Sequence, residues 1–512
     1  MTIRSVFANK VMEIKKIANE DIKNLEEEIN QIEELKISIT QSKANGLVNN
    51  FANSDKVDNA ITILRNKLQK MRLKLSESIK FISTANWFEY GEKSNKFFLN
   101  LNKFKQKQKL ISTITNNGTT KSGQNDVSKC IFDFYKELYS AKPTENDEND
   151  TEFYANCPKI SEADSKHMED KLTITDLQKA LLTCKDSSPG PDGIPYIIYK
   201  KFWKISGQII LDAWDYSLET NKLAPSHSES AITLLPKEGK DRKEIKNWRP
   251  ITLSNCDSKI ITKALSNKIS KTLDSIIDPA QTAYVPGRSV SDNLRTNFFM
   301  KNYCRNNKID SVLISLDAKK AFDSVDHVYI EKTLKAYGYG DNFINTFRLL
   351  YSDISARVLV NGFTTESIKI KRGVKQGDAL SCSLFILCID PLLRNLNNNR
   401  DIKTIKIRNY KNVAYKASAY ADDISIICKN DEKSIQKVFE EYGRLTRRSG
   451  LELNADKTEI LVLNSDVIAS IRITYNGSSF NIKTVKSIKI CGLQFCSSSQ
   501  LEYELNIHEK IN

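Results

Sequence analysis

The sequence predicts an α+β protein, and three observations support that prediction. Helical and strand-like hydrophobic patterns alternate along the chain from about residue 161 onward. The strand-like runs are short and widely separated, which is typical of α+β folds rather than of a doubly wound parallel sheet. The chain has 512 residues, which exceeds one ordinary domain and predicts two or three packed units with ample material for a core.

Each predicted element rests on its own hydrophobic period. Apolar residues at helical spacing predict helices over residues 174–184, 198–223 and 258–277. Short apolar runs rich in branched side chains predict strands over residues 230–236, 311–316, 356–361 and 417–427.

The first 110 residues are predicted to form a basic helical extension. In residues 11–39 and again in residues 59–82, apolar residues recur every three or four positions among charged ones. Two long helices packed as an antiparallel pair explain the stripes best, because each stripe holds for only about three heptads. A dimeric coiled coil and a solvated charged helix are the alternatives.

The next two segments are notable for their charged residues and not for a hydrophobic pattern. Residues 87–109 interleave aromatic residues with lysines, which suits base stacking and phosphate contact, or equally the docking of a helix beneath a basic face. Residues 143–151 are acidic and have no large apolar residue apart from proline, which predicts a linker. We therefore expect residues 111–160 to be a short connecting segment.

The net charge points to a polyanionic partner. Lys and Arg number 77 against 63 Asp and Glu, which gives +14 and favours nucleic acid, with a basic membrane-surface protein as the alternative. The absence of 18 consecutive apolar residues and of a signal-peptide pattern predicts an intracellular protein without a membrane partner. Ten scattered cysteines with no CxxC pair, beside four histidines, argue against zinc and disulfides.

Two adjacent carboxylates stand where a buried strand is expected. Asp422 and Asp423 lie between the strand-like runs 417–420 and 424–428. A three-residue connection that begins at Ala421 and includes both carboxylates predicts a tight hairpin with the two acids at its tip.

A third carboxylate shares this setting. Asp317 directly follows the apolar strand predicted over residues 311–316. If the two strands are neighbours, Asp317, Asp422 and Asp423 converge, and their repulsion favours bound divalent cations. Oxygen ligands without nearby His or Cys select Mg²⁺, with Mn²⁺ as the alternative, and two such ions activate a 3′-hydroxyl and stabilise a leaving pyrophosphate. The chemistry that this predicts is nucleotidyl transfer.

Eight motifs in order give the chain a family resemblance. Tyr420 to Asp423 and Leu316 to Asp326 resemble the two catalytic motifs of reverse transcriptases, in the form found in non-LTR (LINE-type) retrotransposons. The other six matches fall in the order that this family uses, at Ser188–Pro195, Asn247–Ile251, Ala283–Arg288, Arg372–Ser381, Gly450–Lys457 and Cys491–Leu493. Together they cover residues 185 to 495.

The resemblance implies a right-hand polymerase with fingers and palm over residues 161–495. It implies an RNA-directed DNA polymerase that copies an RNA template from a DNA primer with dNTPs. Asp317 and Asp422 would be the main metal ligands and Asp423 a third carboxylate. Phe322 matches the steric gate that excludes a ribose 2′-hydroxyl, whereas its helix position alone favours a core aromatic.

The resemblance also implies nucleotide-binding and acid–base residues. Gly377 would let the backbone approach the nucleotide, or serve as a turn residue, and Gln376 would contact the nucleotide or the template. Arg249 and Lys259 are the candidates to clamp the triphosphate, with Lys237 as an alternative. Lys457 matches the basic residue of the fourth palm motif, which would protonate pyrophosphate.

The end of the chain predicts a truncated protein. Residues 491–493 depart from the aromatic-Leu-Gly primer grip of the family, because Cys491 precedes Gly492. Residues 496–512 would be the start of a truncated thumb, and we expect a fragment without the family's endonuclease. The alternatives are an RNA-templated RNA polymerase and an inactive remnant that only binds RNA. Nuclear action is implied by the family alone.

Overall fold

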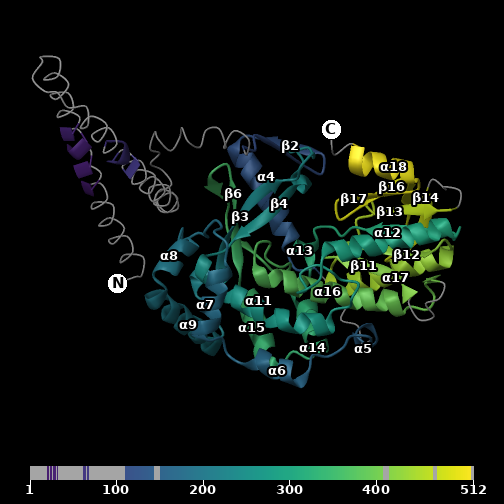
Figure 1. Cartoon of the computed structure of the whole chain (residues 1–512), viewed down its shortest axis with the longest axis horizontal. Coiled ribbons are helices and arrows are strands. Elements are labelled where there is room, and N and C mark those ends of the chain that lie inside the picture. The colour runs from purple at the N-terminus through teal and green to yellow at the C-terminus, as the bar shows by residue number, and fades with distance from the viewer. Residues whose placement is uncertain are drawn as a thin grey trace, which may run out of the picture. The chain divides into compact units, whose positions relative to one another are not determined.

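The computed structural model describes residues 110–142, 150–407, 414–464 and 470–508, with short helical stretches between residues 20 and 32 and between 61 and 67 (Figure 1). Met1–Leu99 and Asn100–Asn512 form two separate units. In the first unit the described residues are helical, as predicted, and Leu25, Ile29 and Ile61 are buried. The predicted helix pairing and the segment 87–109 lie outside the described residues.

A six-stranded sheet lies at the centre of the second unit. Its strands run in the order β11-β12-β5-β13-β15-β14, and β5 is antiparallel to both of its neighbours. The strand β5 is mostly apolar, with serine only at positions 311 and 315, and five of its six residues are buried. This composition is typical of a strand that is covered on both faces. The strands are β5 (Ser311–Leu316), β11 (Ala417–Tyr420), β12 (Asp423–Lys429), β13 (Glu459–Leu463), β14 (Ser470–Tyr475) and β15 (Ser478–Val485).

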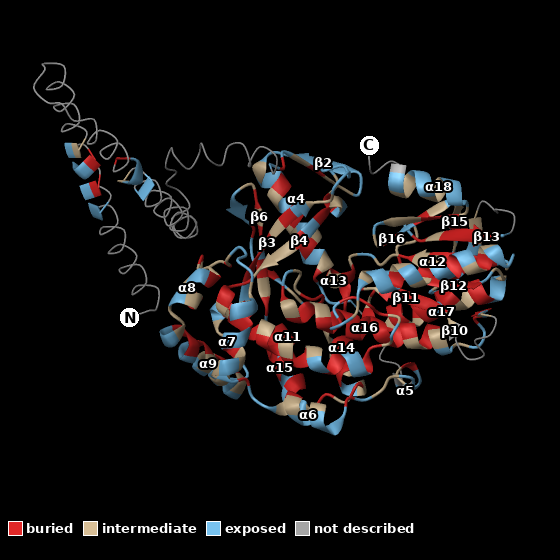
Figure 2. Cartoon of the chain, viewed as in Figure 1, coloured by how far each residue is buried: buried red, intermediate tan, exposed pale blue. Residues whose placement is uncertain are grey.

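The two faces of this sheet pack against different elements. The row Ile426, Ile314 and Ile460 belongs to the main core, together with buried residues of α16 (Ala379–Asn398) and α17 (Glu432–Ser449). The row Ile427, Leu313 and Leu461 packs with α12 (Val290–Asn306) and the hairpin of β16 (Ser487–Ile490) and β17 (Leu493–Cys496). Figure 2 shows the buried residues gathered along α16, α17 and the strands beside them.

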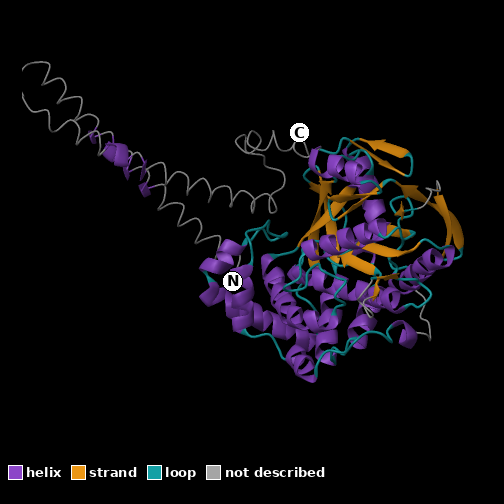
Figure 3. Ribbon diagram, turned by 45° about the vertical axis from the view of Figure 1, so that its right-hand side comes forward, coloured by secondary structure: helices purple, strands orange, loops and turns teal. Residues whose placement is uncertain are grey.

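Apart from the strands of the six-stranded sheet, the main core is built from helices (Figure 3). The longest is α11 (Cys256–Ile276), which contacts α7 and α16 and is buried along most of its length. The others are α5 (Asp150–Phe153), α6 (Glu162–Glu169), α7 (Ile174–Thr183), α8 (Tyr196–Lys201), α9 (Trp203–Thr220), α13 (Ala321–Ser324), α14 (His327–Ala336) and α15 (Asp341–Tyr351). The short helix α10 (Pro225–Ser228) contacts β3 instead.

A five-stranded sheet forms a second layer with its own core. Its strands are β3 (Glu229–Pro236), β4 (Trp248–Leu253), β6 (Ser355–Val360), β7 (Phe363–Thr364) and β8 (Ile368–Lys369). Buried residues of α4 (Gln124–Leu138) cluster with those of this sheet, and the hairpin of β1 (Thr113–Asn116) and β2 (Thr119–Ser122) joins them. Residues 113–138 therefore belong to the packed core of this layer, whereas the sequence predicted that they form a connecting segment.

The remaining short elements lie outside the two large sheets. They are η1 (Ile245–Asn247), β9 (Ile405–Lys406), β10 (Ala414–Tyr415), α18 (Ser499–Tyr503) and η2 (Glu504–His508). Most of the acidic linker predicted at residues 143–151 lies outside the described residues.

Several predicted boundaries agree with the structure and two differ. The strand over residues 311–316 is β5, and the helices predicted over 174–184 and 258–277 are α7 and α11 within two residues at each end. The helix predicted over 198–223 is two helices, because Phe202 leaves the helical conformation and caps both. The strands predicted at 417–420 and 424–428 form the expected antiparallel hairpin, but the second strand begins one residue earlier, at Asp423.

One described helix, α16, has the length and apolar composition of a membrane span. Of its apolar window 83 % is buried inside the protein. Burial of this kind is equally typical of the core helix of a globular fold, and α16 packs against α11, α14 and α17.

Candidate active site

The register of β5 and β12 brings two of the predicted carboxylates to one end of the sheet. Ile424 pairs with Leu316 in the antiparallel ladder, so the next positions outward are Asp423 and Asp317. Asp423 is the first residue of β12 and Asp317 follows the last residue of β5. The predicted neighbourhood of these strands is therefore present, although the residues lie more than a hundred positions apart.

Asp422 lies in the turn between β11 and β12. Tyr420 pairs with Asp423, so the connection is the two residues Ala421 and Asp422, and not the three residues that the sequence predicted. A two-residue hairpin requires left-handed backbone, and Ala421 adopts it with a φ of 56°.

The strained turn is held by a residue that sequence reasoning missed. The Gln281 side chain is fully buried, and its Oε1 accepts hydrogen bonds from the backbone N–H of Ala421 at 2.9 Å and of Ala283 at 3.0 Å. Its Nε2 donates to the Ala421 carbonyl at 3.3 Å. Gln281 thus binds both backbone groups of the residue that precedes Asp422.

The carboxylates influence one another. Burial raises the pKa of Asp422 above its ordinary value, and the neighbouring carboxylate of Asp317 raises it further. Although Asp423 is an exposed residue, desolvation and then repulsion from Asp422 and Asp317 raise its pKa to about 6. A bound cation would stabilise the ionised forms of these clustered carboxylates. The cluster is therefore a candidate cation-binding site.

Asp317 has two polar partners in the turn before β13. Asn454 Nδ2 donates to Asp317 Oδ2 at 2.8 Å, and Lys457 Nζ lies 3.4 Å from the same oxygen. The sequence predicted Lys457 at the site. Asn454 lies in the same predicted motif but was not singled out, although its backbone N–H also donates to the Asp317 carbonyl at 2.8 Å.

Further cations surround the carboxylates. Burial, and next the positive charges of Lys457 and Arg249, lower the pKa of Lys237. The same two charges partly oppose the rise that burial causes in the pKa of Asp422. Burial lowers the pKa of Lys320 to about 8, with Lys237 and Lys457 adding to the shift. Like charges gathered in this way fit an anionic ligand, and Lys237 and Lys320 join the predicted Arg249 and Lys457.

Lys259 lies elsewhere in the fold. Its ammonium is buried, donates to the Ser188 carbonyl at 2.9 Å and stands 5.2 Å from the centre of the Tyr196 ring. It therefore fixes the loop at residues 187–188, and the structure does not bring it together with the carboxylates. Its predicted role as a triphosphate clamp has no support in this geometry.

Phe322 is half-buried on α13. Its ring stacks on Phe385 of α16 with the centroids 4.4 Å apart, so the alternative of a core aromatic also describes it. The Phe322 carbonyl accepts a hydrogen bond from the Val374 N–H at 2.7 Å, which joins α13 to the loop that carries Gln376 and Gly377. Phe322, Gln376 and Gly377, three of the five predicted nucleotide-binding residues, thus belong to one neighbourhood.

Two features of the structure explain why residue 377 is a glycine. Its φ is 111°, a conformation that L side chains rarely adopt, and a Cβ there would lie 3.0 Å from the Thr252 carbonyl oxygen. The adjacent Gln376 carbonyl accepts from the Thr252 N–H at 2.8 Å, which anchors this loop on β4.

The β16–β17 hairpin also approaches the carboxylates. Its two turn residues, Cys491 and Gly492, have φ values of 46° and 87°. Burial raises the pKa of the Cys491 thiol to about 12, with the charges of Asp423 and Asp422 as the next causes. The segment predicted as a primer grip therefore lies within electrostatic reach of the site.

Comparison with known proteins identifies the family. The family model for reverse transcriptase (RNA-dependent DNA polymerase) matches residues 235–495, which include every predicted site residue. The chain belongs to the reverse transcriptase family. The match supports the predicted RNA-directed DNA polymerase activity and confirms the α+β fingers-and-palm fold.

Curated relatives of this reverse transcriptase come from transposable elements. It is 30 % identical over 403 residues to an uncharacterized 149 kDa protein of transposon TX1 from Xenopus laevis, which covers 78 % of the chain and 30 % of that protein. It is 29 % identical over 288 residues to a Pol polyprotein from the type-2 retrotransposable element R2DM of Drosophila melanogaster. That match covers 56 % of the chain and 26 % of the polyprotein.

A third relative agrees with these two. A Pol polyprotein from a type-1 retrotransposable element R2 of Popillia japonica is 27 % identical over 57 % of the chain and 39 % of its own length. The chain thus spans less than half the length of each of these relatives. The predicted resemblance to reverse transcriptases of non-LTR retrotransposons is confirmed.

The family implies the use of a divalent metal ion, and the donor set of this reverse transcriptase fits one. Asp317, Asp422 and Asp423 offer oxygen ligands only, which suit hard cations such as Mg²⁺. Within the described ranges, no three His, Cys, Asp or Glu side chains lie close enough to hold a metal ion by themselves.

Proposed function

We propose that this chain is an RNA-directed DNA polymerase that copies an RNA template into DNA from a primer. The observation that carries the proposal is the register of β5 and β12, which brings Asp317 and Asp423 to one sheet end beside the turn residue Asp422. Membership of the reverse transcriptase family supports RNA as the template and dNTPs as the substrates. Nuclear action is part of the proposal only as an implication of the family resemblance.

Asp317 and Asp422 would hold two Mg²⁺ ions, with Asp423 as a third carboxylate and Mn²⁺ as an alternative metal. Bound ions of this kind lower the pKa of a primer 3′-hydroxyl and neutralise charge on the leaving pyrophosphate. The residues of the chain supply the remaining functions. Asn454 orients the Asp317 carboxylate through its 2.8 Å hydrogen bond, and Gln281 fixes the turn that presents Asp422.

The cations around the site would bind the triphosphate. Arg249, Lys237 and Lys320 offer positive charge next to the carboxylates, and charge that is preorganised in this way stabilises a transition state without reorganisation. Lys457 is exposed and lies 3.4 Å from Asp317, so it can deliver a proton to the departing pyrophosphate. Phe322, which is half-buried, would be the steric gate that excludes a ribose 2′-hydroxyl.

The test is Mg²⁺-dependent extension of a DNA primer on an RNA template with dNTPs. We expect extension by the unmodified chain and a loss of at least about a thousandfold in an Asp422→Ala, Asp423→Ala double variant, because oxygen ligands are essential to metal-assisted transfer. Replacement of Mg²⁺ by EDTA abolishes extension in the same assay.

The matched control is Asp353→Asn. Asp353 carries the same carboxylate, but its side chain is 94 % exposed and its oxygen lies 3.9 Å from Lys369 Nζ, so extension should equal that of the unmodified chain. A chain that binds RNA/DNA duplex equally well with and without its two aspartates, and adds no nucleotide in either form, would contradict the proposal. That result would favour the alternative of a remnant that only binds RNA.

A further inference from the structure

The strand β17 has one edge that lies against side chains instead of another strand. Among the described strands, β17 pairs with β16 alone. Backbone groups on such an edge need other hydrogen-bond partners where they are shielded from water. Gln494 and Cys496 lie two positions apart on β17, so their backbone N–H groups point to the same side. Side chains of α18 and η2 bind both of them.

The Asn506 side chain of η2 binds this edge in the way that a neighbouring strand would. The Gln494 N–H donates to Asn506 Oδ1 at 2.8 Å, and Asn506 Nδ2 donates to the Gln494 carbonyl at 2.7 Å. One amide group thus satisfies both backbone groups of one residue, as a hydrogen-bonded partner does in an antiparallel ladder. Asn506 is half-buried, so the contact is partly shielded from water.

Glu502 of α18 makes a second contact with the same edge. Its Oε1 accepts a hydrogen bond from the Cys496 N–H at 3.1 Å and pairs with the ammonium of Lys301 on α12, whose side chain is fully buried. Arg305 of α12 also donates to the Ser499 hydroxyl at 2.9 Å. These contacts attach α18 to α12 and attach β17 to both helices.

The hairpin that this edge supports has its turn beside the carboxylates. Its first strand, β16, contacts β5 and β13 of the six-stranded sheet. The turn consists of Cys491 and Gly492, which both have a positive φ, and Cys491 lies within electrostatic reach of Asp422 and Asp423. Gln494 follows the turn by two residues, so a contact that fixes the Gln494 backbone also fixes the turn.

We propose that Asn506 is a positioning residue that holds the turn of the β16–β17 hairpin in a fixed place beside the carboxylates, with Glu502 as a second support. The inference rests on the proposed polymerase function. It gives α18 and η2 a part in that function, although they follow the family-matched residues 235–495. A primer whose 3′-hydroxyl reacts at the carboxylates has this turn as a neighbouring surface, so movement of the turn would misalign the hydroxyl.

The test compares Asn506→Leu with a matched control, Gln436→Leu. Gln436 of α17 makes the same paired contact with an edge strand, because its Nε2 donates to the Thr474 carbonyl and its Oε1 accepts from the Thr474 N–H, both at 2.9 Å. Thr474 lies on β14, at the edge of the six-stranded sheet and three strands away from β5. Each variant therefore loses one amide with two hydrogen bonds, but only Asn506→Leu changes the support of the hairpin.

The first readout is the rate at which iodoacetamide alkylates Cys491, measured by mass spectrometry of the peptide that contains it. We expect Asn506→Leu to raise this rate by about tenfold, because local opening of the hairpin is easier without the two hydrogen bonds. The rate at Cys130 of α4, which is also half-buried, should not change. Gln436→Leu should leave both rates as they are in the unmodified chain.

The second readout is single-nucleotide extension of a primer. We expect Asn506→Leu to lower kcat by about tenfold, because the primer terminus is no longer aligned, and to leave the KM for dNTPs little changed. Gln436→Leu should leave both constants unchanged. Thermal unfolding shows whether each variant is folded, and Asn506→Ala, which also removes the amide, replaces the leucine variant if that variant does not fold.

Two results would overturn the inference. The first is an unchanged alkylation rate at Cys491 in Asn506→Leu, or a rise that Cys130 shares, because the turn would then not depend on this contact in particular. The second is an unchanged kcat in Asn506→Leu, or an equal fall in Gln436→Leu, which would mean that these amides only stabilise sheet edges. Alkylation needs no polymerase activity. A lack of extension by the unmodified chain would therefore overturn the proposed function, while the alkylation rate still decides whether Asn506 holds the turn.

Discussion

At the scale of single residues, Gly373 illustrates how little space separates the parts of the site. Its φ is 85°, and the three atoms nearest to the Cβ that an alanine would place there all belong to the backbone of Asp323, between 2.6 and 2.8 Å away. Backbone atoms cannot rotate aside as the end of a flexible side chain can. The glycine is therefore required by conformation and by space together.

We expect Gly373→Ala to destabilise the protein by more than the strain of its backbone conformation alone. A positive φ costs an alanine on the order of 1–3 kcal/mol, and the clash with Asp323 adds to that cost. The measurement is the urea dependence of unfolding. The control is Gly118→Ala, with a φ of 78° and nothing within 4 Å of its Cβ, and equal losses in the two variants would contradict the prediction.

At the scale of elements, the segment before α12 acts as a support for the hairpin that carries Asp422. The Ala419 N–H donates to the Ala280 carbonyl at 2.9 Å, and the Thr282 N–H donates to the Ala419 carbonyl at 3.0 Å. Arg288 Nη1 binds the carbonyls of Asp278 and Gln281 at 2.7 and 2.9 Å, which closes this segment on itself. Gln281 at its centre then reaches Ala421.

We expect Gln281→Leu to slow primer extension and to destabilise the fold. The buried N–H groups of Ala421 and Ala283 would lose their acceptor, at about 1–3 kcal/mol for each unsatisfied group. The Mg²⁺ concentration for half-maximal extension should rise, because the turn that presents Asp422 would lose its support. Urea unfolding and a Mg²⁺ titration of the extension rate measure the two effects.

The control for this prediction is Thr282→Val. Its hydroxyl makes only a 3.4 Å contact with the Ala419 carbonyl, while its backbone bond to the same oxygen remains. We expect a change within about 0.5 kcal/mol and the same Mg²⁺ dependence as the unmodified chain. A Gln281→Leu variant with normal Mg²⁺ dependence would show that the hairpin does not need this support.

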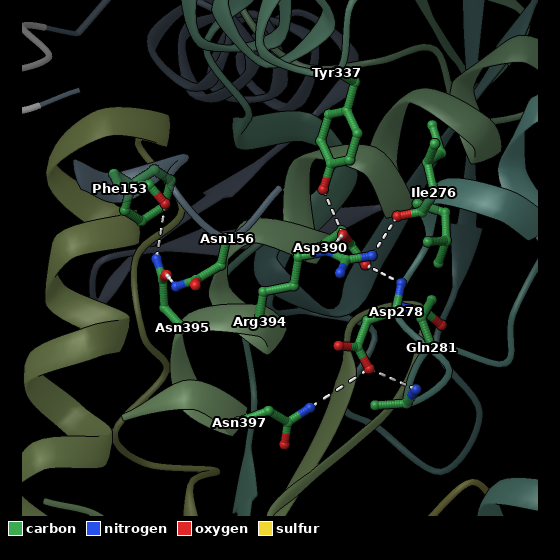
Figure 4. A network of polar contacts seen from close by, with 12 residues as sticks. Phe153, Asn156, Ile276, Asp278, Gln281, Tyr337, Asp390, Arg394, Asn395 and Asn397 are labelled. Carbon is green, nitrogen blue, oxygen red and sulfur yellow. Dashed lines mark hydrogen bonds and ion pairs between the residues drawn. The ribbon is translucent and has the colours of Figure 1, made fainter. Parts of the chain in front are cut away.

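At the scale of the whole molecule, a buried polar network joins elements that are far apart in sequence (Figure 4). Asp390 of α16 is fully buried and accepts hydrogen bonds from Arg394 Nε at 2.6 Å, from the Asp278 N–H at 2.6 Å and from the Tyr337 hydroxyl. Arg394 also donates to the Ile276 carbonyl. The network thus ties α16, the end of α14 and the end of α11 to the segment that supports the catalytic hairpin.

We expect Arg394→Met to destabilise the fold by about 3 kcal/mol at pH 8, because it leaves a buried carboxylate without its cation. Burial already raises the pKa of Asp390, and the loss of Arg394 would raise it further. When the pKa of a carboxyl group is higher in the folded than in the unfolded protein, the folded protein loses stability as the pH rises above the unfolded pKa. The loss of unfolding free energy in Arg394→Met should therefore be smaller at pH 5 than at pH 8. Unfolding at both pH values measures it.

The control is Lys335→Met. Lys335 and Glu331 are also four residues apart on one helix and 2.7 Å from each other, but their side chains are 49 % and 22 % exposed. We expect a loss of less than about 1 kcal/mol at either pH. Two results would contradict the prediction. One is an equal loss of unfolding free energy in the two variants, and the other is a loss in Arg394→Met that does not change with pH.

The sequence by itself determined the fold class, the central strand and the identity of the carboxylates. Four of the five residues in Val312–Leu316 are apolar and they occupy both faces of the strand, so a buried strand and its end at Asp317 could be predicted from this run. Asp422 and Asp423 were predicted in the same way, from the apolar runs on either side. These features depend on the local pattern of apolar residues, which can be seen in the sequence itself.

Only the tertiary structure decided which residues meet. Asn454 binds Asp317 and Gln281 binds Ala421 across more than a hundred residues, and Tyr139 reaches Asp323 from a segment that the sequence predicted to be a connector. Lys259, predicted as a nucleotide ligand, is instead buried against the loop at Ser188. A hydrogen bond between distant residues leaves no periodic pattern, because it depends on the packing of whole elements, and so no local signal identified these partners.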